Sequence, residues 1–278
     1  MCKMSYWSLM TVKIGFIGAG RMAGAMIKGL IVKNIYSKDE IVACAPTDTT
    51  RARVAGEYGI KMYETAAEIA KEADILVLAV KPKHVPDLFE KEHLTLGPQH
   101  LLISIAAGVK IETLNSYVPD SRIVRVMPNH CCMVLEGASG YVKGTNATEK
   151  DMKTVNTILS ALGLAVEVRE CDLDAVTGVS GSSPAYIYMM IRAIADAGVL
   201  AGLTRKTSVE LAAQSMIGAG KMILESGMTP EQLIDGVCSP GGTTIEGVNV
   251  LKNNDFESIV IDAVNASIKR SIEMGKTY

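Results

Sequence analysis

Glycines at two places in the chain have the spacing of segments that bind anions. Residues 18–23, Gly-Ala-Gly-Arg-Met-Ala, fit the G-x-G-x-x-G/A pattern, and residues 239–244, Ser-Pro-Gly-Gly-Thr-Thr, place two glycines before two hydroxyl side chains. Backbone N–H groups that no side chain covers can hold a phosphate or a carboxylate, above all where a helix begins. The two segments are therefore candidate sites for a nucleotide and for a small acid.

The first glycine segment lies between an apolar run at residues 12–17 and a helical pattern at residues 21–32. Gly18 permits a tight turn, and Gly20 lacks a Cβ, so that a pyrophosphate can lie against the backbone. An ordinary turn between a strand and a helix can contain the same glycines, but a position at the start of a strand–helix series favours dinucleotide binding. The predicted cofactor-binding residues of this turn are Gly18, Ala19, Gly20, Arg21 and Met22.

The end of the second predicted strand indicates which dinucleotide binds. An NAD site usually has Asp or Glu there, whereas residues 43–47 read Ala-Cys-Ala-Pro-Thr. Thr47 and Arg51 follow, and a hydroxyl and a guanidinium suit the 2′-phosphate of NADP. The alternative is that Arg51 is a solvated helix residue. We therefore expect NADPH, with contacts from Ala45, Thr47 and Arg51, and leave the use of NADH open.

Three further loops should close over the cofactor, because open α/β sheets bind ligands at the carboxyl ends of their strands. Pro and Gly just past a strand also occur in ordinary chain reversals. These residues are therefore selected by their position after a strand more than by their type. The predicted contacts from these loops are Ala79, Val80, Lys81, Pro82, Ile105, Ala106, Ala107 and Asn129.

Short apolar runs alternate with helical patterns throughout the first half of the chain. The predicted strands are residues 12–17, 41–45, 75–80, 101–105 and 123–127, with weaker candidates at 140–142 and 165–168, and the predicted helices are 21–32, 50–58 and 66–72. Strands that are apolar throughout imply a parallel sheet covered on both faces. The fold class is therefore α/β, with an N-terminal doubly wound, Rossmann-type sheet.

After about residue 171 the chain is rich in Ala, Met, Ile and Leu, and its pattern is helical. The predicted helices are residues 184–201, 206–226, 230–236, 243–251 and 256–273. Thr204 is a predicted N-cap, and residues 229–232 have the capping-box spacing. We divide the chain into a dinucleotide domain at 1–169, of which 1–10 form a loose tail, and a helical domain at 170–278. Long apolar helices in so small a domain favour a homodimer over a self-contained bundle.

Composition excludes several other classes of protein. The chain of 278 residues is 48% hydrophobic and 21% charged, a balance that can bury a sizeable core. Its net charge of −2 gives no field that would attract nucleic acid or an anionic membrane. No apolar run approaches the roughly 20 residues that span a bilayer. The cysteines form no CxxC pair and the histidines are scattered, so we expect reduced thiols, no metal site and a cytoplasmic location.

Six segments, in order, resemble the pyrroline-5-carboxylate reductase family. They are FIGAGRM at 16–22, AVKP at 79–82, SIAAG at 104–108, RVMPN at 125–129, TGVSGSSPAY at 177–186 and SPGGTTIEG at 239–247. The resemblance spans the chain from about residue 12 to its end. It implies NAD(P)H-dependent reduction of 1-pyrroline-5-carboxylate to L-proline, the last step of proline biosynthesis. It also implies a helical domain that dimerises and often builds a ring of dimers.

The same resemblance implies where the small-molecule substrate binds. Thr244 is the catalytic candidate, since its hydroxyl would hydrogen-bond the ring nitrogen and help to deliver the proton. From the residues alone, segment 239–244 fits a simple N-cap turn as well as an anion-binding nest. A protonated imine is already electrophilic, so positioning and electrostatics can carry most of the rate. The substrate-binding residues implied are Asp235, Gly236, Ser239, Gly242, Thr243 and Thr244.

Two departures from the family pattern bear on the substrate. His130-Cys131 follow RVMPN where the family usually has Thr-Pro, and we favour a tolerated loop residue over a proton donor for His130. Ser183 occupies a glycine position and would be strained if its φ were positive. The rival functions are reduction of another cyclic imine, β-hydroxyacid dehydrogenation, which would need a catalytic lysine, and dinucleotide sensing without catalysis. Lys221, which lies deep in the predicted helix at residues 206–226, has no site context.

Overall fold

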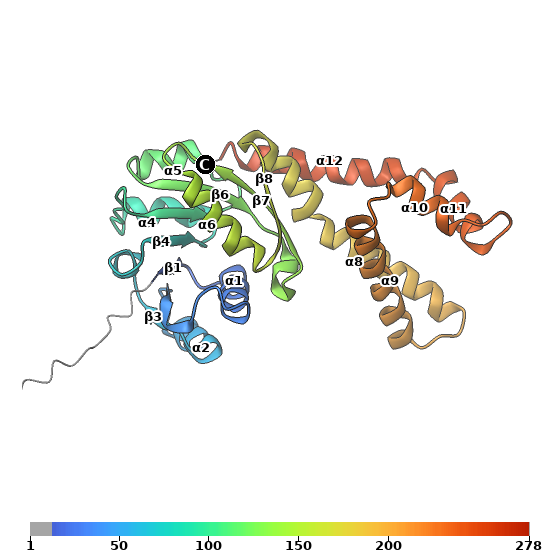
Figure 1. The fold of residues 1–278 in the computed structure, drawn as a ribbon, viewed down its shortest axis with the longest axis horizontal. Coiled ribbons are helices and arrows are strands. Elements are labelled where there is room, and N and C mark those ends of the chain that lie inside the picture. The colour runs from blue at the N-terminus through green and yellow to red at the C-terminus, as the bar shows by residue number, and fades with distance from the viewer. Residues whose placement is uncertain (1–12, 278) are drawn as a thin grey trace, which may run out of the picture. The chain divides into compact units, whose positions relative to one another are not determined.

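The computed structural model describes residues 13–277, which form two compact units (Figure 1). The sheet unit comprises residues 13–181 and 267–277, and the helical unit comprises residues 182–266. The loose tail predicted at residues 1–10 lies outside the described residues. The predicted division into residues 1–169 and 170–278 concerns where the dimerising region begins. It stays a prediction.

An eight-stranded sheet forms the centre of the sheet unit, with the strand order β3-β2-β1-β4-β5-β6-β7-β8. Every neighbouring pair is parallel except β6 with β7. The central strands β1, β2, β4 and β5 consist mostly of buried apolar residues, as strands covered on both faces must. The strands are β1 Ile14–Ile17, β2 Ile41–Cys44, β3 Lys61–Tyr63, β4 Ile75–Leu78, β5 Leu101–Ser104, β6 Arg122–Met127, β7 Gly137–Lys143 and β8 Gly163–Glu167.

Helices cover both faces of this sheet, and each face has its own hydrophobic core (Figure 1). One core packs against α1 (Arg21–Val32), α2 (Asp48–Tyr58) and α6 (Glu149–Ser160). The other core packs against α3 (Ala66–Ile69), α4 (Val85–Glu90), α5 (Ile111–Tyr117) and α7 (Leu173–Val176). The predicted α/β class with a doubly wound sheet is thus confirmed.

The sequence patterns did not predict some elements. β3 has three partly exposed residues and no apolar run, and α4 and α5 are too short to show a period. The antiparallel strand β7 corrects the expectation of an entirely parallel sheet. Residues 128–136, which join it to β6, are fewer than the dozen or so that a parallel crossover needs. Helix α6 was missed, although Thr148 and Asp151 form a capping box at its start.

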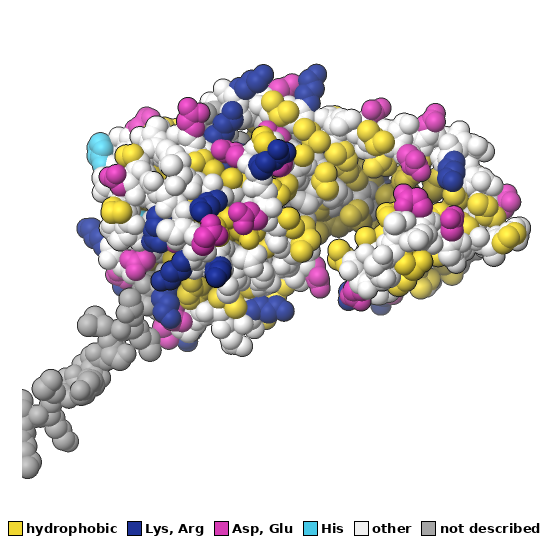
Figure 2. Space-filling view, turned by 45° about the horizontal axis from the view of Figure 1, so that its top comes forward, with side chains coloured by type: hydrophobic (Ala, Val, Ile, Leu, Met, Phe, Trp, Pro, Cys, Tyr) yellow, Lys and Arg dark blue, Asp and Glu magenta, His cyan; other side chains and the backbone are white. Residues whose placement is uncertain are grey.

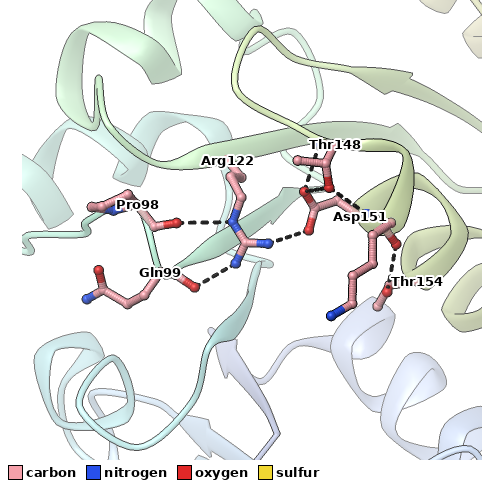
Figure 3. A network of polar contacts seen from close by, with 7 residues as sticks. Pro98, Gln99, Arg122, Thr148, Asp151 and Thr154 are labelled. Carbon is pink, nitrogen blue, oxygen red and sulfur yellow. Dashed lines mark hydrogen bonds and ion pairs between the residues drawn. The ribbon is translucent and has the colours of Figure 1, made fainter.

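A polar network at the start of β6 ties that strand to α6 (Figure 3). The Arg122 guanidinium donates to the carbonyl oxygens of Pro98, at 3.1 Å, and Gln99, at 2.6 Å, and pairs with the buried carboxylate of Asp151. The second oxygen of Asp151 accepts from the backbone N–H of Thr148 at 2.8 Å and from its hydroxyl at 2.6 Å. The ion pair is thereby also hydrogen-bonded, which is the condition for burying charge without a large penalty.

The helical unit contains α8 (Ser183–Leu200), α9 (Arg205–Glu225), α10 (Pro230–Val237), α11 (Thr243–Asn253) and the first part of α12 (Phe256–Met274). These bounds lie within two residues of the predicted ones. The predicted caps are confirmed: Thr204 accepts from the N–H of Thr207 at 3.1 Å, and Thr229 exchanges hydrogen bonds with Gln232. The end of α12 belongs to the sheet unit, where the Ser271 hydroxyl donates to Asp174 at 2.5 Å.

Few side chains of the helical unit are buried. Among its described residues only Pro184, Ala195, Ser208 and Ala212 are buried, while Leu200 is 90% exposed and Leu224 is 74% exposed. Hydrophobic side chains accordingly reach much of its surface (Figure 2). No helix in the described part of the chain is long and apolar enough to cross a membrane. Apolar surface of this extent marks a protein–protein contact.

Candidate functional site

The first glycine segment lies where the strand order reverses. β1 has β2 on one side and β4 on the other, and the carboxyl ends of these strands meet at one edge of the sheet. A cleft of about 380 Å³ opens there, and its lining includes Gly18, Ala19 and Gly20 from the turn, with Ala45 after β2 and residues 79–81 after β4. This switch point is where doubly wound sheets bind nucleotides.

The backbone of the turn fits a diphosphate. Gly18 has a φ of +96°, and a Cβ there would lie 3.0 Å from the Ala79 carbonyl oxygen, so only glycine is accommodated. Gly20 is the N-cap of α1, and no side chain caps the helix. A Cβ on Gly20 would meet nothing within 4 Å, because it would point into open space where a ligand can approach the backbone. The N–H groups of the first turn of α1 are therefore available to an anion.

Charge divides the cleft into two parts. A hollow beside the turn is lined by three cations, Arg21, Arg53 and Lys81, together with the hydroxyls of Thr47 and Thr50. No carboxylate is among the described residues that line this hollow. The deeper part next to β4 shares Lys81 with the hollow, but its lining also includes Glu64, His84, Asp87 and Glu92. The cationic hollow suits phosphates, and the acidic part suits an uncharged base with exocyclic N–H donors.

Two groups in the deeper part of the cleft have shifted pKa values. The hydrogen bond and ion pair with Lys91 lower the pKa of Asp87 below its usual range. Burial raises the pKa of the Cys44 thiol to about 11. Cys44 is therefore a neutral thiol at physiological pH, which excludes it as a nucleophile.

Arg51 lies beside the cleft, but its guanidinium is already bonded within the protein. It donates to the Ala45 carbonyl oxygen at 2.7 Å and pairs with Asp48, and its side chain is only 19% exposed. It is not among the residues that line either part of the cleft. The neighbouring Arg53, which the sequence patterns did not indicate, does line the hollow beside the glycine turn. The signal was available, because Thr50 and Arg53 have the i, i+3 spacing that places both on one face of α2.

Several other predicted cofactor residues lie outside the lining. Met22 and Ile105 pack partly buried against one core, and Ala106 belongs to the other. The Asn129 side chain accepts from the N–H groups of Cys131, at 3.2 Å, and Ala138, at 3.1 Å, and donates to the Ser180 carbonyl oxygen. Their contacts with a cofactor stay predictions, as do those of Pro82 and Ala107. The sequence patterns did not indicate these lining residues: Ile17, Cys44, Pro46, Thr50, Arg53, Glu64, Ala66, His84, Asp87, Leu88 and Glu92.

The second glycine segment forms the start of α11 in the helical unit. The N–H of Gly242 donates to the Ser239 carbonyl oxygen at 3.0 Å, and Gly241 adopts a φ of +67°. Gly242 is the N-cap with no side-chain capping bond, and a Cβ on it would fall 2.4 Å from the Ser239 hydroxyl. The turn is therefore held closed, and the first N–H groups of α11 have no intrahelical partner. Such an arrangement can bind a small carboxylate.

The remaining predicted substrate residues surround this turn. Asp235 and Gly236 are exposed in the last turn of α10, and Thr243 and Thr244 are exposed in the first turn of α11. Thr244 also contributes to an apolar cavity of about 400 Å³ that is lined by residues of α9, α10 and α11. The segment thus places one hydroxyl at the border between a polar helix start and an apolar wall.

The two departures from the family pattern have local explanations. Ser183 is the first residue of α8 and is absent from the non-glycine residues with positive φ, so it carries no backbone strain. His130 begins a short 3₁₀ helix and is exposed. Lys221 is exposed on α9 and does not line the apolar cavity, so the structure gives no support to a catalytic lysine there.

The doubly wound sheet, the glycine turn at its switch point and the cationic hollow define a dinucleotide-binding protein of the Rossmann class. Residues 13–108 match the family model "NADP oxidoreductase coenzyme F420-dependent", and residues 170–274 match "Pyrroline-5-carboxylate reductase dimerisation". Two pyrroline-5-carboxylate reductases, from Methanosarcina acetivorans and Arabidopsis thaliana, are 43% and 38% identical to it, over 95% of this chain and 98% and 96% of theirs. The chain belongs to the pyrroline-5-carboxylate reductase family.

Solved structures agree with this assignment. The pyrroline carboxylate reductase of Plasmodium falciparum, determined with NADP bound, is 35% identical and superposes with a TM-score of 0.83, covering 96% of this chain and 99% of that one. The enzyme from Coxiella burnetii is 32% identical with a TM-score of 0.87, covering 95% and 98%. The fold class and family predicted from sequence are confirmed, and the match over 170–274 shows a region of self-association.

Proposed function

We propose that this protein reduces 1-pyrroline-5-carboxylate to L-proline with NADPH. The observation that carries the proposal is its relationship to pyrroline-5-carboxylate reductases over 95% of the chain, together with a diphosphate-shaped turn at the switch point. The reaction adds a hydride to the imine carbon and a proton to the ring nitrogen. When bound, NADPH supplies the hydride.

The cofactor side of the proposal depends on the cleft of the sheet unit. The first-turn N–H groups of α1 bind the diphosphate, while Arg21 and Lys81 neutralise its charge. The apolar residues after β4, Ala79 and Val80, provide a wall against which an adenine ring can lie. This assignment is supported by the open space in front of Gly20 and by the NADP bound in the Plasmodium falciparum relative.

The substrate side depends on segment 239–244. The N–H groups at the start of α11 hold the carboxylate, and the Thr244 hydroxyl donates to or accepts from the ring nitrogen. Ser239 and Thr243 supply further hydroxyls at the same turn. No strong acid is needed, because protonation of the imine precedes hydride addition and the site need only orient the ring.

The working form of the enzyme is a homodimer joined through region 170–274. The exposed apolar side chains of the helical unit support this arrangement, and we extend it to a ring of dimers. We place the enzyme in the cytoplasm, in keeping with the free thiols of all its described cysteines.

The test is NADPH oxidation by the purified protein with 1-pyrroline-5-carboxylate, a six-membered cyclic imine acid and a 2-keto acid, each followed by NADPH absorbance. We expect turnover on the five-membered imine to exceed the others. Thr244→Ala should lower kcat by about fivefold while NADPH affinity stays within about twofold, since a neutral hydrogen bond contributes about 1 kcal/mol. Thr244→Ser, which keeps the hydroxyl, should retain most activity. Preference for another substrate would contradict the proposal.

A further inference from the structure

The cationic hollow beside the glycine turn contains an arginine whose bonding capacity is only partly used. Arg53 comes from the second turn of α2, and one of its terminal nitrogens donates to the Ala19 carbonyl oxygen at 3.2 Å. The other pairs with Glu57 at 3.1 Å, in a contact whose side chains are about half exposed. A guanidinium has five N–H donors, so more than half of this one remains available to a ligand.

Arg51, two residues earlier, differs in each of these respects. Its side chain is 19% exposed, against 54% for Arg53, and its guanidinium is bonded to the Ala45 carbonyl oxygen and to Asp48. These bonds hold the turn between β2 and α2 closed. Arg51 is therefore a residue that shapes the wall of the cleft, whereas Arg53 projects into the hollow.

Hydroxyl groups beside Arg53 complete an anion site. Thr47 is the N-cap of α2, and its hydroxyl donates to the Thr50 hydroxyl oxygen at 2.8 Å. The Thr50 hydroxyl hydrogen is consequently left for a further acceptor. Thr50 and Arg53 share a face of α2, and both line the hollow in which no described carboxylate is found. This combination of a planar cation with hydroxyl donors suits a phosphomonoester.

We infer that Arg53, assisted by Thr50, is the residue of this chain that binds the 2′-phosphate of NADPH and sets its preference over NADH. The inference rests on the proposed use of NADPH. Its geometric basis is the contact with Ala19: a guanidinium anchored to the carbonyl of the diphosphate-binding turn lies close to the ribose end of the same ligand. Arg51 positions this wall but makes no contact with the phosphate.

The test uses titration calorimetry of the full-length protein with adenosine 2′,5′-bisphosphate and with adenosine 5′-monophosphate. Arg53→Ala should weaken binding of the bisphosphate by about 10- to 100-fold and of the monophosphate by less than about threefold, because a charge-assisted hydrogen bond is lost to the 2′-phosphate alone. Retained monophosphate binding shows that the variant is folded. Equal weakening of both ligands, or of neither, would overturn the inference.

Two matched variants sharpen the result. Arg51→Ala should weaken both ligands to a similar extent, because it loosens the turn that both contact; selective loss of the bisphosphate would give the role to Arg51 instead. Glu57→Gln, an exposed change that releases Arg53 from its ion pair, should tighten only the bisphosphate by about two- to fivefold. Weaker bisphosphate binding in this variant would contradict the inference.

Kinetics then connect the site to catalysis. In Arg53→Ala the ratio of KM for NADPH to KM for NADH should rise about as much as the bisphosphate affinity falls, with kcat little changed. Because neither adenosine ligand contains the imine, the calorimetric result is independent of which substrate is reduced. Failure of the proposed imine reduction and failure of the Arg53 assignment are therefore distinguishable.

Discussion

The two units of the protein bury their apolar residues to very different extents. The sheet unit has a core on each face of its sheet, with residues such as Phe16, Leu76 and Ile103 fully buried. The helical unit has a similar supply of apolar residues but leaves most of them exposed within a single chain. The sheet unit is thus stabilised by contacts within one chain, whereas the helical unit, which lies within the match to a dimerisation family model, exposes apolar surface that self-association would bury.

The largest expected effect comes from the core of the sheet unit. Leu76→Ala should lower the free energy of unfolding by about 2–5 kcal/mol, since it removes a fully buried side chain and leaves a cavity. Leu164→Ala on β8, where the side chain is 55% exposed, is the control and should cost less than about 1 kcal/mol. Denaturant unfolding monitored at several protein concentrations measures both. An effect of Leu76→Ala that vanished at high concentration would contradict stabilisation within the chain.

A charge on the exposed apolar surface of the helical unit should act on assembly instead. Val237→Glu should weaken self-association by about 30-fold or more, because burying an unpaired charge on apolar surface costs about 2 kcal/mol or more. Val237 is 66% exposed and lines the apolar cavity of α9–α11. Val134→Glu, at a position 69% exposed in the sheet unit, is the matched control and should leave the sedimentation of the dimer unchanged. Equal dissociation by both variants would remove the distinction between the units.

The glycine turn offers a change that leaves folding intact but blocks binding. Gly20→Val places its side chain in open space, so the free energy of unfolding should change by less than about 1 kcal/mol. The added side chain would stand where the diphosphate must approach, and NADPH affinity should fall by at least about tenfold, or 1.4 kcal/mol. Gly56→Val, which also enters open space but lies outside the cleft lining, should bind NADPH normally. Fluorescence titration with NADPH compares the two.

The smallest expected effect is a pH dependence at the edge of the sheet unit. The hydrogen bond from Lys13 and those from Ser37 hold the pKa of Glu40 at about 2, below its ordinary value. A lowered folded-state pKa gives a stabilisation that is complete above the unfolded pKa near 4.5 and is lost as pH falls toward 2. Glu40→Gln should therefore flatten the stability profile slightly between those values. Acid unfolding that is steeper in the variant would contradict this account.

Sequence patterns predicted the elements in which burial or helix capping directly restricts the residue types. Fully apolar runs identified β1, β2, β4 and β5, because strands buried on both faces need apolar side chains at every position. Threonines at 204 and 229 marked helix starts, because their hydroxyls satisfy N–H groups that the helix leaves free. Short or edge elements such as β3 lack that signal, since partial exposure permits almost any residue.

The candidate site was predictable to the level of its segments but less so to the level of its side chains. The glycine turn can be recognised in the sequence because its backbone restricts two residue types. Gly18 has a positive φ, and Gly20 leaves open space for a ligand to approach. Arg51 and Arg53 are chemically identical, and only their position on α2 decides that Arg51 bonds to Ala45 after β2 while Arg53 lines the hollow and bonds to Ala19 of the glycine turn. Likewise, the amide of Asn129 suits a ligand, but three backbone groups of the protein already engage it.

The last helix has a consequence for how the chain is made. Residues 267–277 belong to the sheet unit although 85 residues of the helical unit, 182–266, precede them, and Ser271 there bonds to Asp174. The ribosome must therefore synthesise nearly the whole chain before all segments of the sheet unit are present. A nascent chain stalled within α11 would hold an unfinished sheet unit, so premature termination late in translation should yield protein prone to degradation rather than a working half-enzyme.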